Sequence, residues 1–297
     1  MNAPVNAINH VESGRQGGVG RHENEEIRTD AQTPMPTETM HIALLHLAPV
    51  SADVNGNRRL IERAITKAAD AGAAWIITPE LAVCGYTFAD RIGTDWIVSP
   101  PDPWITTVRR LAARRRVTVF LSHPERDGRS DTLHNTLFVI SSDGAITGKH
   151  RKINTLRKGS EAWSNPGDRA TPIRVPPVSR VGILICADAC SPGISGSLRS
   201  QGAQLLISSA AWAPGYHGPQ GEWERCTVVT GLPLFVCNRT GPDRTLDFTQ
   251  AESVVVKDGR RLLSLSSERS VIFVTEWNLT AQKLATPAYQ RILAAGS

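Results

Sequence analysis

The chain has 297 residues, of which 40% are hydrophobic and 21% are charged, and its formal net charge is +5. This length can bury a large core in one domain or two small ones. The modest charge argues against a nucleic-acid partner, and no apolar run approaches the length of a membrane span. The first residues also lack the apolar stretch and small-residue cleavage site of a secretory signal.

The predicted elements alternate between strands and helices from residue 41 onward. Residues 1–38 are polar and rich in Gly, Asn, Glu and Pro, which predicts a disordered tail. A single domain is expected over 39–280, and 281–297 is expected to be a C-terminal extension that is a candidate for a dimer contact. Helices are expected after Asn55 or Asn57 as the cap, over 103–115, up to about 202, and over 219–230. The predicted strands are 41–47, 74–77, 117–121, 136–140, 145–150, 181–186, 204–208, 234–238, 252–256, 261–265 and 271–276.

The densest basic run lies on the helix expected over 103–115. Its apolar positions Trp104, Val108 and Leu111 are helically spaced, so arginines such as Arg110 and Arg114 fall on the opposite face. No aromatic residue interleaves with these arginines, and a solvated surface helix is the favoured interpretation.

The five cysteines are an odd number with irregular spacing. A disulfide framework is typical of small secreted domains, so we expect this chain in a reducing cytoplasm. The segment Cys186-Ala187-Asp188-Ala189-Cys190 lacks the paired spacing and partner histidines of a zinc site, and no metal site is predicted.

Glu80 and Cys186 each follow directly on a predicted strand. Side chains at the carboxyl ends of strands are held by the sheet and face the cleft where ligands bind. A thiol there needs activation, because the thiolate is the nucleophile. A glutamate beside an apolar wall can have a raised pKa and act alternately as acid and base. Taken singly, Cys186 also fits a buried structural cysteine, and Glu80 a surface ion pair.

Lys152 closes the run Lys149-His150-Arg151-Lys152, which taken alone is typical of a solvated surface. A lysine directed into a cleft can instead stabilise the negative charge that develops on a carbonyl oxygen. Glu161 follows nine residues later and can reach the same cleft, where it would orient Lys152 or the substrate. Together with Glu80 and Cys186, these residues suit the cleavage of a carbonyl–nitrogen bond.

The ordered set resembles the nitrilase, or carbon–nitrogen hydrolase, superfamily. The signatures of that superfamily are a P-E-x-x-x-x-G-Y element, an R-K element after an N-T strand, and an I-C-x-D element followed by a proline. In this chain they read Pro79-Glu80 with Gly85-Tyr86, Asn135-Thr136 with Arg151-Lys152, and Ile185-Cys186-Ala187-Asp188 with Pro192. Each piece is weak, but the ordered set is highly specific and spans roughly residues 40–277.

The resemblance implies an α/β fold, namely an α-β-β-α sandwich that pairs into an eight-layered dimer, with no metal or organic cofactor. It also implies a Glu80–Lys152–Cys186 triad with Glu161 as a fourth member. In the implied mechanism Glu80 takes the thiol proton and Cys186 attacks the substrate carbonyl. Lys152 and the backbone N–H of Ala187 then stabilise the oxyanion, and a thioester forms that water hydrolyses.

Three reaction classes stay open: hydrolysis of an amide or carbamoyl amine, hydrolysis of a nitrile, and amide formation by acyl transfer. Ala187 and Asp188 after the cysteine resemble the amidase branches, so a small-molecule amide is the expected substrate. Gly193 and Gly196 stand where family members often carry a glutamate and an arginine. This departure bears on the choice of substrate and on the dimer contact, and it leaves the triad intact. An inactive binding protein on the same scaffold also stays open.

Aromatic residues after the strand 204–208 are candidates for reading the substrate. These are Trp212, Tyr216 and His217. Trp163, from the earlier loop over 153–172, is a further candidate. The tryptophans fit packing in the core or a dimer equally well. Together these observations predict a cytoplasmic homodimer or higher homo-oligomer that acts on a small molecule and associates with neither nucleic acid nor membrane.

Overall fold

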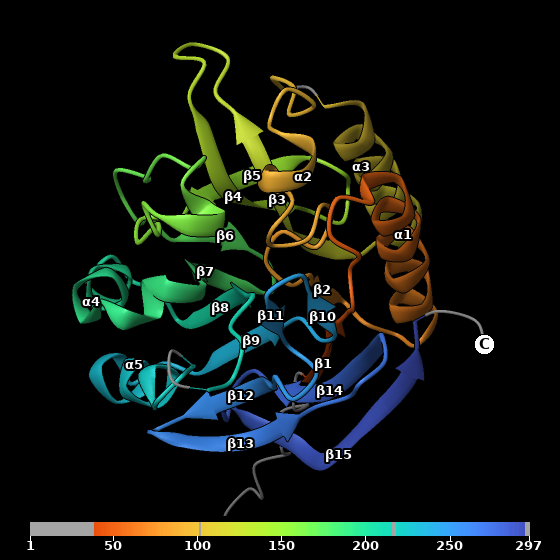
Figure 1. The fold of residues 1–297 in the computed structure, drawn as a ribbon. Helices are drawn as coiled ribbons and strands as arrows, with labels where there is room; N and C mark the ends of the chain where they lie inside the picture. Colours follow the sequence, from red (N-terminus) through yellow and green to blue (C-terminus); the bar gives the residue numbers. More distant parts are fainter. Residues whose placement is uncertain (1–38, 101, 216–217, 295–297) are drawn as a thin grey trace, which may run out of the picture. The chain divides into compact units, whose positions relative to one another are not determined.

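A computed structural model of the chain describes residues 39–100, 102–215 and 218–294. Two β-sheets face each other, and helices cover the outer face of each sheet, so the described part has four layers (Figure 1). This arrangement confirms the mixed α/β fold, with helices flanking the sheets, that the sequence predicts.

The first sheet has seven strands in the order β15-β14-β1-β2-β3-β4-β5. β1, β2 and β3 run parallel, and the other neighbours are antiparallel. Helix α1 (Val54–Asp70) packs against β1 and β14, α3 (Pro103–Arg115) packs beside α1, and α2 (Ala89–Ile92) lies between β2 and α3 in the chain. The strand bounds are β1 Thr39–His46, β2 Trp75–Ile77, β3 Thr118–Arg126, β4 Leu133–Ile140, β5 Ile146–Arg151, β14 Val271–Asn278 and β15 Lys283–Leu293.

The second sheet has six strands in the order β13-β12-β9-β8-β7-β6. Its central strands β7, β8 and β9 run parallel. Helix α4 (Pro192–Ser200) packs against β7, and α5 (Glu222–Thr230) packs against β12. The strand bounds are β6 Ile173–Val175, β7 Val178–Ile185, β8 Leu205–Ala210, β9 Leu234–Asn238, β12 Ser253–Lys257 and β13 Arg260–Leu265, with a separate pair β10 Pro242–Asp243 and β11 Leu246–Asp247.

Asp53 caps helix α1, because its Oδ1 accepts the backbone N–H of Gly56 at 2.9 Å. The prediction that Asn55 or Asn57 caps this helix is therefore wrong, since both residues lie within it. Asn57 is buried instead, and its side chain bonds the backbone N–H and carbonyl of Val50 at 2.8 and 2.7 Å.

Helix α3 buries one face, as its spacing predicts. Trp104, Val108 and Leu111 are buried, whereas Arg110 and Arg114 are exposed. The basic run is therefore the outer face of an amphipathic helix. Neither this helix nor any other in the described part of the chain is long and apolar enough to cross a membrane.

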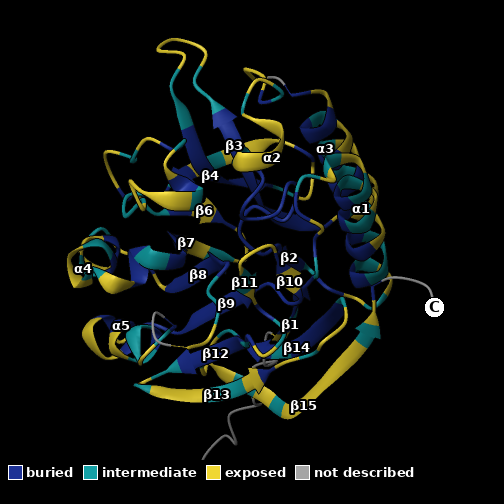
Figure 2. Cartoon of the chain, viewed as in Figure 1, coloured by how far each residue is buried: buried dark blue, intermediate teal, exposed yellow. Residues whose placement is uncertain are grey.

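The region expected as a C-terminal extension contributes a full strand. β15 pairs antiparallel with β14, with Leu293 opposite Val271 and Lys283 opposite Asn278. Figure 2 shows β15 and β13 largely exposed at the sheet edges, whereas β8 and β9 are buried. The ordered sheet thus reaches Leu293. The tail predicted over 1–38 lies outside the described residues.

His46, at the end of β1, is buried and predicts a pH-dependent stability. Its Nδ1 lies 3.0 Å from both the carbonyl oxygen of Asn238 and the hydroxyl of Ser253. Burial lowers the pKa of His46 to about 4, although its hydrogen bonds to backbone partly oppose that shift. Between pH 6.5 and 4, His46 is therefore mostly protonated in the unfolded chain but mostly neutral in the folded chain. The free energy of unfolding consequently falls as the pH falls.

A His46→Asn variant keeps an N–H near the Nδ1 position but cannot titrate. Across the same pH window its free energy of unfolding should fall by about 3 kcal/mol less than that of the wild type. Urea denaturation at a series of pH values measures this difference. Parallel pH profiles for the two proteins would rule out His46 as the titrating group.

Candidate active site

The ends of three strands from the two facing sheets meet at one place. Glu80 follows β2 in the first sheet, and Cys186 follows β7 in the second. Ala211, directly after β8, connects them, because its backbone N–H donates to Glu80 Oε2 at 2.9 Å and β8 pairs with β7, the strand that ends just before Cys186. The sheet architecture therefore brings together a carboxylate and a thiol that are far apart in the sequence.

The ammonium group of Lys152 lies between two buried carboxylates. Its Nζ is 2.8 Å from Glu80 Oε1 and 2.7 Å from Glu161 Oε1, and none of the three side chains is more than 1% exposed. Lys152 follows β5, and Glu161 ends a short 3-10 helix, Gly159–Glu161. The two lysines of the basic run Lys149–Lys152 therefore differ in burial. Lys149 is exposed and pairs with Glu125, whereas Lys152 is buried.

Asn135 joins the two carboxylates. From the sequence this residue is identified only as part of a signature, and no role is predicted for it. Its Nδ2 donates to Glu80 Oε1 at 2.8 Å and to Glu161 Oε1 at 2.9 Å. Asn135 lies on β4 between His134 and Thr136 and is fully buried. A buried amide in such a strand needs polar partners, and this requirement is the signal that could have singled it out.

Cys186 has a left-handed backbone conformation, with φ at 45°. A residue other than glycine rarely adopts this region, and it costs on the order of 1–3 kcal/mol. β7 ends at Ile185, and a 3-10 helix over Cys186–Cys190 begins at once, so the strain sits at a sharp strand-to-helix turn. Turns of this kind hold the nucleophile at the end of a sheet in α/β-hydrolases.

The charges of the cluster favour a neutral thiol and a charged lysine. Burial, followed by the negative charge of Glu80, raises the pKa of Cys186 well above its usual value. Burial also raises the pKa of Glu80, although Lys152 opposes that shift. Burial alone would lower the pKa of Lys152, but the negative charges of Glu80 and Glu161 outweigh it and raise the pKa. The resting thiol therefore needs a base before it can attack.

Asp188 ties the turn that holds Cys186 to the loop that follows Lys152. It is fully buried, and burial would raise its pKa, but its hydrogen bonds and His150 lower it. Each of its two carboxylate oxygens accepts two hydrogen bonds, with donor–acceptor distances of 2.8 to 3.0 Å. The four donors are the backbone N–H groups of Ile153, Asn154 and Ile185 and Nε2 of His150.

A buried ion pair supports the other side of the cluster through Tyr86. The hydroxyl of Tyr86 donates to Glu161 Oε2 at 3.5 Å, and its backbone N–H donates to Asp243 Oδ2 at 2.7 Å. Asp243 also accepts from Thr87 and from the guanidinium of Arg239, and both members of this ion pair are fully buried.

An Asp243→Asn variant should lose about 3–5 kcal/mol of unfolding free energy, because Arg239 would remain buried without a counter-charge. Urea denaturation followed by circular dichroism measures the loss. Asp131→Asn is the matched control, since Asp131 is 79% exposed and pairs with Arg126 at the surface; its loss should stay below about 1 kcal/mol. Equal losses in the two variants would contradict this account of the buried pair.

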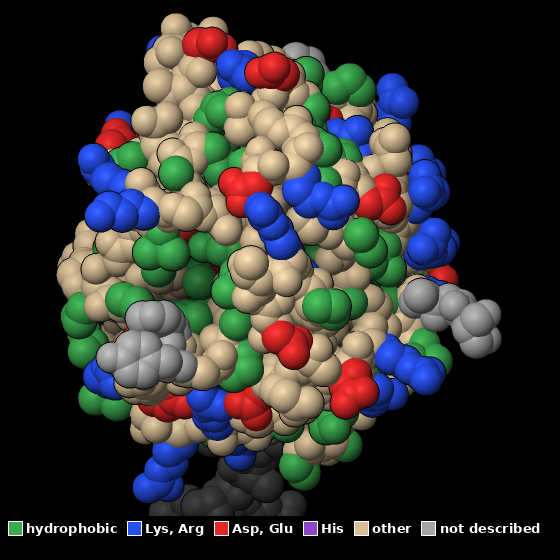
Figure 3. Space-filling model, in the orientation of Figure 1, with side chains coloured by type: hydrophobic (Ala, Val, Ile, Leu, Met, Phe, Trp, Pro, Cys, Tyr) green, Lys and Arg blue, Asp and Glu red, His purple; other side chains and the backbone are tan. Residues whose placement is uncertain are grey.

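A cavity of about 650 Å³ opens above Cys186, and Lys152, Ala187 and Trp212 also line it. Figure 3 shows hydrophobic side chains around a hollow on the face in view, beside α4. Of the aromatic residues predicted to contact a substrate, Trp212 lies in this wall. Trp163 is not among the described residues that line the cavity, because its ring packs edge-on against Phe88 at 5.2 Å between centroids.

The other two predicted contacts, Tyr216 and His217, lie outside the described residues.

Ala187 occupies the first turn of the 3-10 helix after Cys186, where backbone N–H groups have no partner within the helix. Within the part of the chain that the structure describes, no three His, Cys, Asp or Glu side chains are placed to hold a metal ion.

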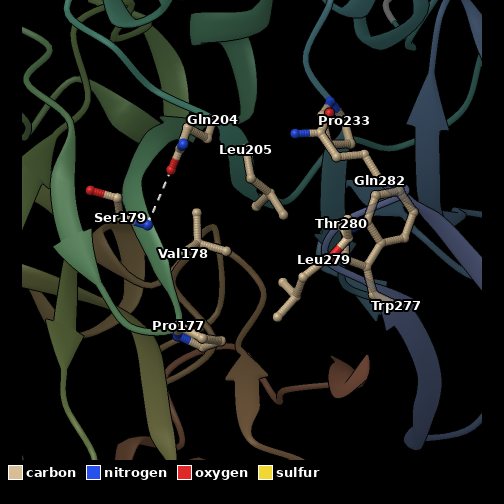
Figure 4. Close-up of a pocket in the computed structure, with 10 residues that line it drawn as sticks. All are labelled: Pro177, Val178, Ser179, Gln204, Leu205, Pro233, Trp277, Leu279, Thr280 and Gln282. Carbon is tan, nitrogen blue, oxygen red and sulfur yellow. Dashed lines mark hydrogen bonds between the residues drawn. The ribbon is translucent and has the colours of Figure 1, made fainter. Parts of the chain in front are cut away.

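A second cavity, of about 300 Å³, lies at the opposite ends of the strands (Figure 4). Its wall includes Val178 at the start of β7, Leu205 at the start of β8 and Trp277 near the end of β14. The catalytic candidates follow the carboxyl ends of β2 and β7, so this cavity does not belong to the cluster around Cys186.

Comparisons with known proteins agree with this geometry. A family model described as carbon–nitrogen hydrolase matches residues 41–268. A nitrilase from Pyrococcus abyssi is 26% identical over 229 residues, covering 76% of this chain and 85% of that protein. The chloroplastic omega-amidase of Arabidopsis thaliana is 28% identical over 205 residues, covering 63% of this chain and 54% of that protein.

Among solved structures, a mutant of the amidase from Nesterenkonia sp. AN1 superposes with a TM-score of 0.72 at 23% identity. The match covers 83% of this chain and 93% of the amidase. That structure shows the acetamide moiety of fluoroacetamide added covalently at the amidase's active-site cysteine. At this level of identity the likeness establishes a shared fold.

Proposed function

Since the chain belongs to the carbon–nitrogen hydrolase family, we propose that it hydrolyses the amide bond of a small molecule to give an acid and ammonia or an amine. The observation that carries this proposal is the ammonium of Lys152, held between Glu80 and Glu161 beside a cavity that the sulfur of Cys186 lines. Such a cluster supplies a nucleophile, a proton carrier and a fixed positive charge at one point.

In the first half of the reaction, Glu80 takes the proton of the Cys186 thiol, and the sulfur attacks the amide carbonyl carbon. The carbon–sulfur bond forms, and the carbon–nitrogen bond then breaks. Glu80 returns its proton to the nitrogen, which leaves as ammonia or an amine. The N–H of Ala211 donates to Glu80 and holds this carboxylate beside the cavity that Cys186 lines, where the transfer takes place.

In the second half, water replaces the leaving nitrogen. Glu80 takes a proton from the water, whose oxygen attacks the thioester carbon, and the carbon–sulfur bond breaks. The proton returns to the sulfur, and the acid leaves. One carboxylate thus carries the proton in both directions, which suits a buried glutamate with a raised pKa.

Lys152 and the backbone N–H of Ala187 are proposed to stabilise the negative oxygen in both halves. Each such donor contributes roughly 3–4 kcal/mol to the transition state. Lys152 is positioned in advance by Glu80, Glu161 and, through the carboxylates, by Asn135. Its charge therefore needs no reorganisation when the oxyanion forms.

Ammonia release across a panel of amides, carbamoyl amines and nitriles tests the proposal. We expect turnover of amides, with one acid formed per ammonia. Turnover of nitriles alone would favour the nitrilase alternative, and a new amide formed with an added amine in place of acid would favour acyl transfer. No turnover of any class would favour an inactive binding protein, although Glu80, Lys152, Glu161 and Cys186 are all present.

We further propose that two copies pair through α5. Val228 and Val229 on this helix are 66% and 55% exposed, which leaves two neighbouring apolar side chains in contact with solvent. Light scattering after size exclusion should give twice the 32.2 kDa chain mass. A mass of one chain at micromolar concentration would refute the pairing.

A reducing, cytoplasmic setting is proposed on the state of the thiols. All five cysteines are free, and four of them are buried. An oxidising compartment would expose the catalytic sulfur to disulfide exchange. Cell fractionation should place the chain with cytosolic markers, and recovery with secreted proteins would contradict this.

A further inference from the structure

The described wall of the cavity above Cys186 is mainly apolar apart from the catalytic groups and Tyr86. Leu156, Trp212, Pro214 and Leu246 contribute aliphatic, aromatic and ring carbon surface to it. Among the described lining residues, Lys152 is the only charged one, and its ammonium already pairs with two carboxylates. The described part of the wall therefore offers no further charge to a substrate.

The charges beside the cavity are also occupied or solvated. Glu222 and Arg225 both act electrostatically on Cys190 in the wall, but they pair with each other at 2.7 Å. Arg157 and Lys158 follow Leu156, are exposed, and are not among the described residues lining the cavity. A charged substituent that entered the cavity would lose its hydration without gaining a counter-charge from the described residues, which is strongly unfavourable.

We propose that the substrate is a neutral amide whose acyl group is apolar, either branched aliphatic or aromatic, and that monoamides of dicarboxylic acids are rejected. This inference rests on the proposed amide hydrolysis and names its substrate class. Apolar surface gains about 25 cal/mol per Å² on leaving water. At about 650 Å³ the cavity is in the usual range for small-molecule sites, so size does not exclude such an acyl group.

Two amides of equal size separate charge from shape. Isocaproamide and succinamate differ only in that an isopropyl group replaces a carboxylate. We expect kcat/KM for isocaproamide to exceed that for succinamate by at least about 100-fold. Binding of the same two compounds to Cys186→Ala, followed by tryptophan fluorescence or calorimetry, should show the same preference without any turnover.

A charged variant tests the wall itself. Leu246→Arg places a cation in it, and Leu246→Gln adds a polar group without charge. Leu246→Arg should shift the kcat/KM ratio toward succinamate by about tenfold or more, whereas Leu246→Gln should shift it by less than about threefold. If either variant fails to fold, the comparison of the two amides on the wild type and on Cys186→Ala still decides the matter.

The outcomes separate the inference from the proposed function. Tighter binding and faster turnover of succinamate would overturn the apolar substrate class while leaving the hydrolase intact. Preferential binding of isocaproamide without release of ammonia from either amide would support the cavity inference and count against the amide hydrolysis. Equal kcat/KM and equal binding for the two compounds would also overturn the inference.

Discussion

Replacing Cys186 with alanine should lower kcat/KM for amide hydrolysis by at least about 10⁴-fold and leave the fold intact. The sulfur is the one group in the cluster that can form the thioester, and neither Glu80 nor water in the same place can substitute for it at comparable speed. Alanine takes the same backbone conformation at φ 45° with no larger side chain, so the turn needs no rearrangement. Ammonia release measures the effect, and circular dichroism checks the fold.

Cys190→Ala is the matched control, because Cys190 is a free thiol that lines the same cavity. It follows Cys186 on the same 3-10 helix but lies outside the hydrogen-bonded cluster. This variant should keep at least about a tenth of the activity. If Cys190→Ala were inactive and Cys186→Ala active, the roles of the two thiols would be reversed.

Replacing Lys152 with methionine should cost both activity and stability. Loss of the ammonium removes an oxyanion donor, worth roughly 10²–10³ in kcat, and also the group that orients Glu80. It leaves Glu80 and Glu161 buried with no cation between them, and breaking a buried pair in this way costs about 3–5 kcal/mol. Activity assays and urea denaturation measure the two effects separately.

The stability loss of Lys152→Met should depend on pH with a defined sign. Without the ammonium, burial favours the protonated carboxyl, so the pKa of Glu80 in the folded variant rises further above its unfolded value. The deficit relative to wild type is then smallest below about pH 4.5 and grows as the pH rises. Lys149→Met, which removes the exposed lysine three residues earlier on β5, should cost less than about 1 kcal/mol at every pH. Similar losses for both lysines would contradict the assigned burial.

The positions of Glu80 and Cys186 could be predicted from the sequence because each ends an apolar strand run. They follow strands of two different sheets, so the strand ends alone did not place them together, and the resemblance of the ordered set to the superfamily did. Lys152 was harder to place, because the run Lys149–Lys152 resembles a solvated surface. The structure decides it, since Lys149 within β5 is exposed whereas Lys152, just after β5, is buried against Glu161.

The residues that hold the cluster in place could not be inferred in the same way. Asn135, Asp188 and Asp243 act through hydrogen bonds to groups that are mostly more than 20 residues away, and such partners leave no local pattern. The edge strand β15 was missed because it alternates weakly, with most of its residues exposed. Asp53 was not predicted as the N-cap of α1, because Asn55 and Asn57 nearby have an equally high propensity for that position.

The most direct test of the account is to identify which atom carries the acyl group during turnover. The chain is quenched with acid while it hydrolyses an excess of amide, then digested, and its peptides are weighed by mass spectrometry. We predict a mass increase equal to the acyl group on the peptide that contains Cys186, lost after the substrate is consumed. Sustained turnover with the acyl group on another residue, or with none on Cys186 under conditions that trap thioesters, would contradict the proposed chemistry.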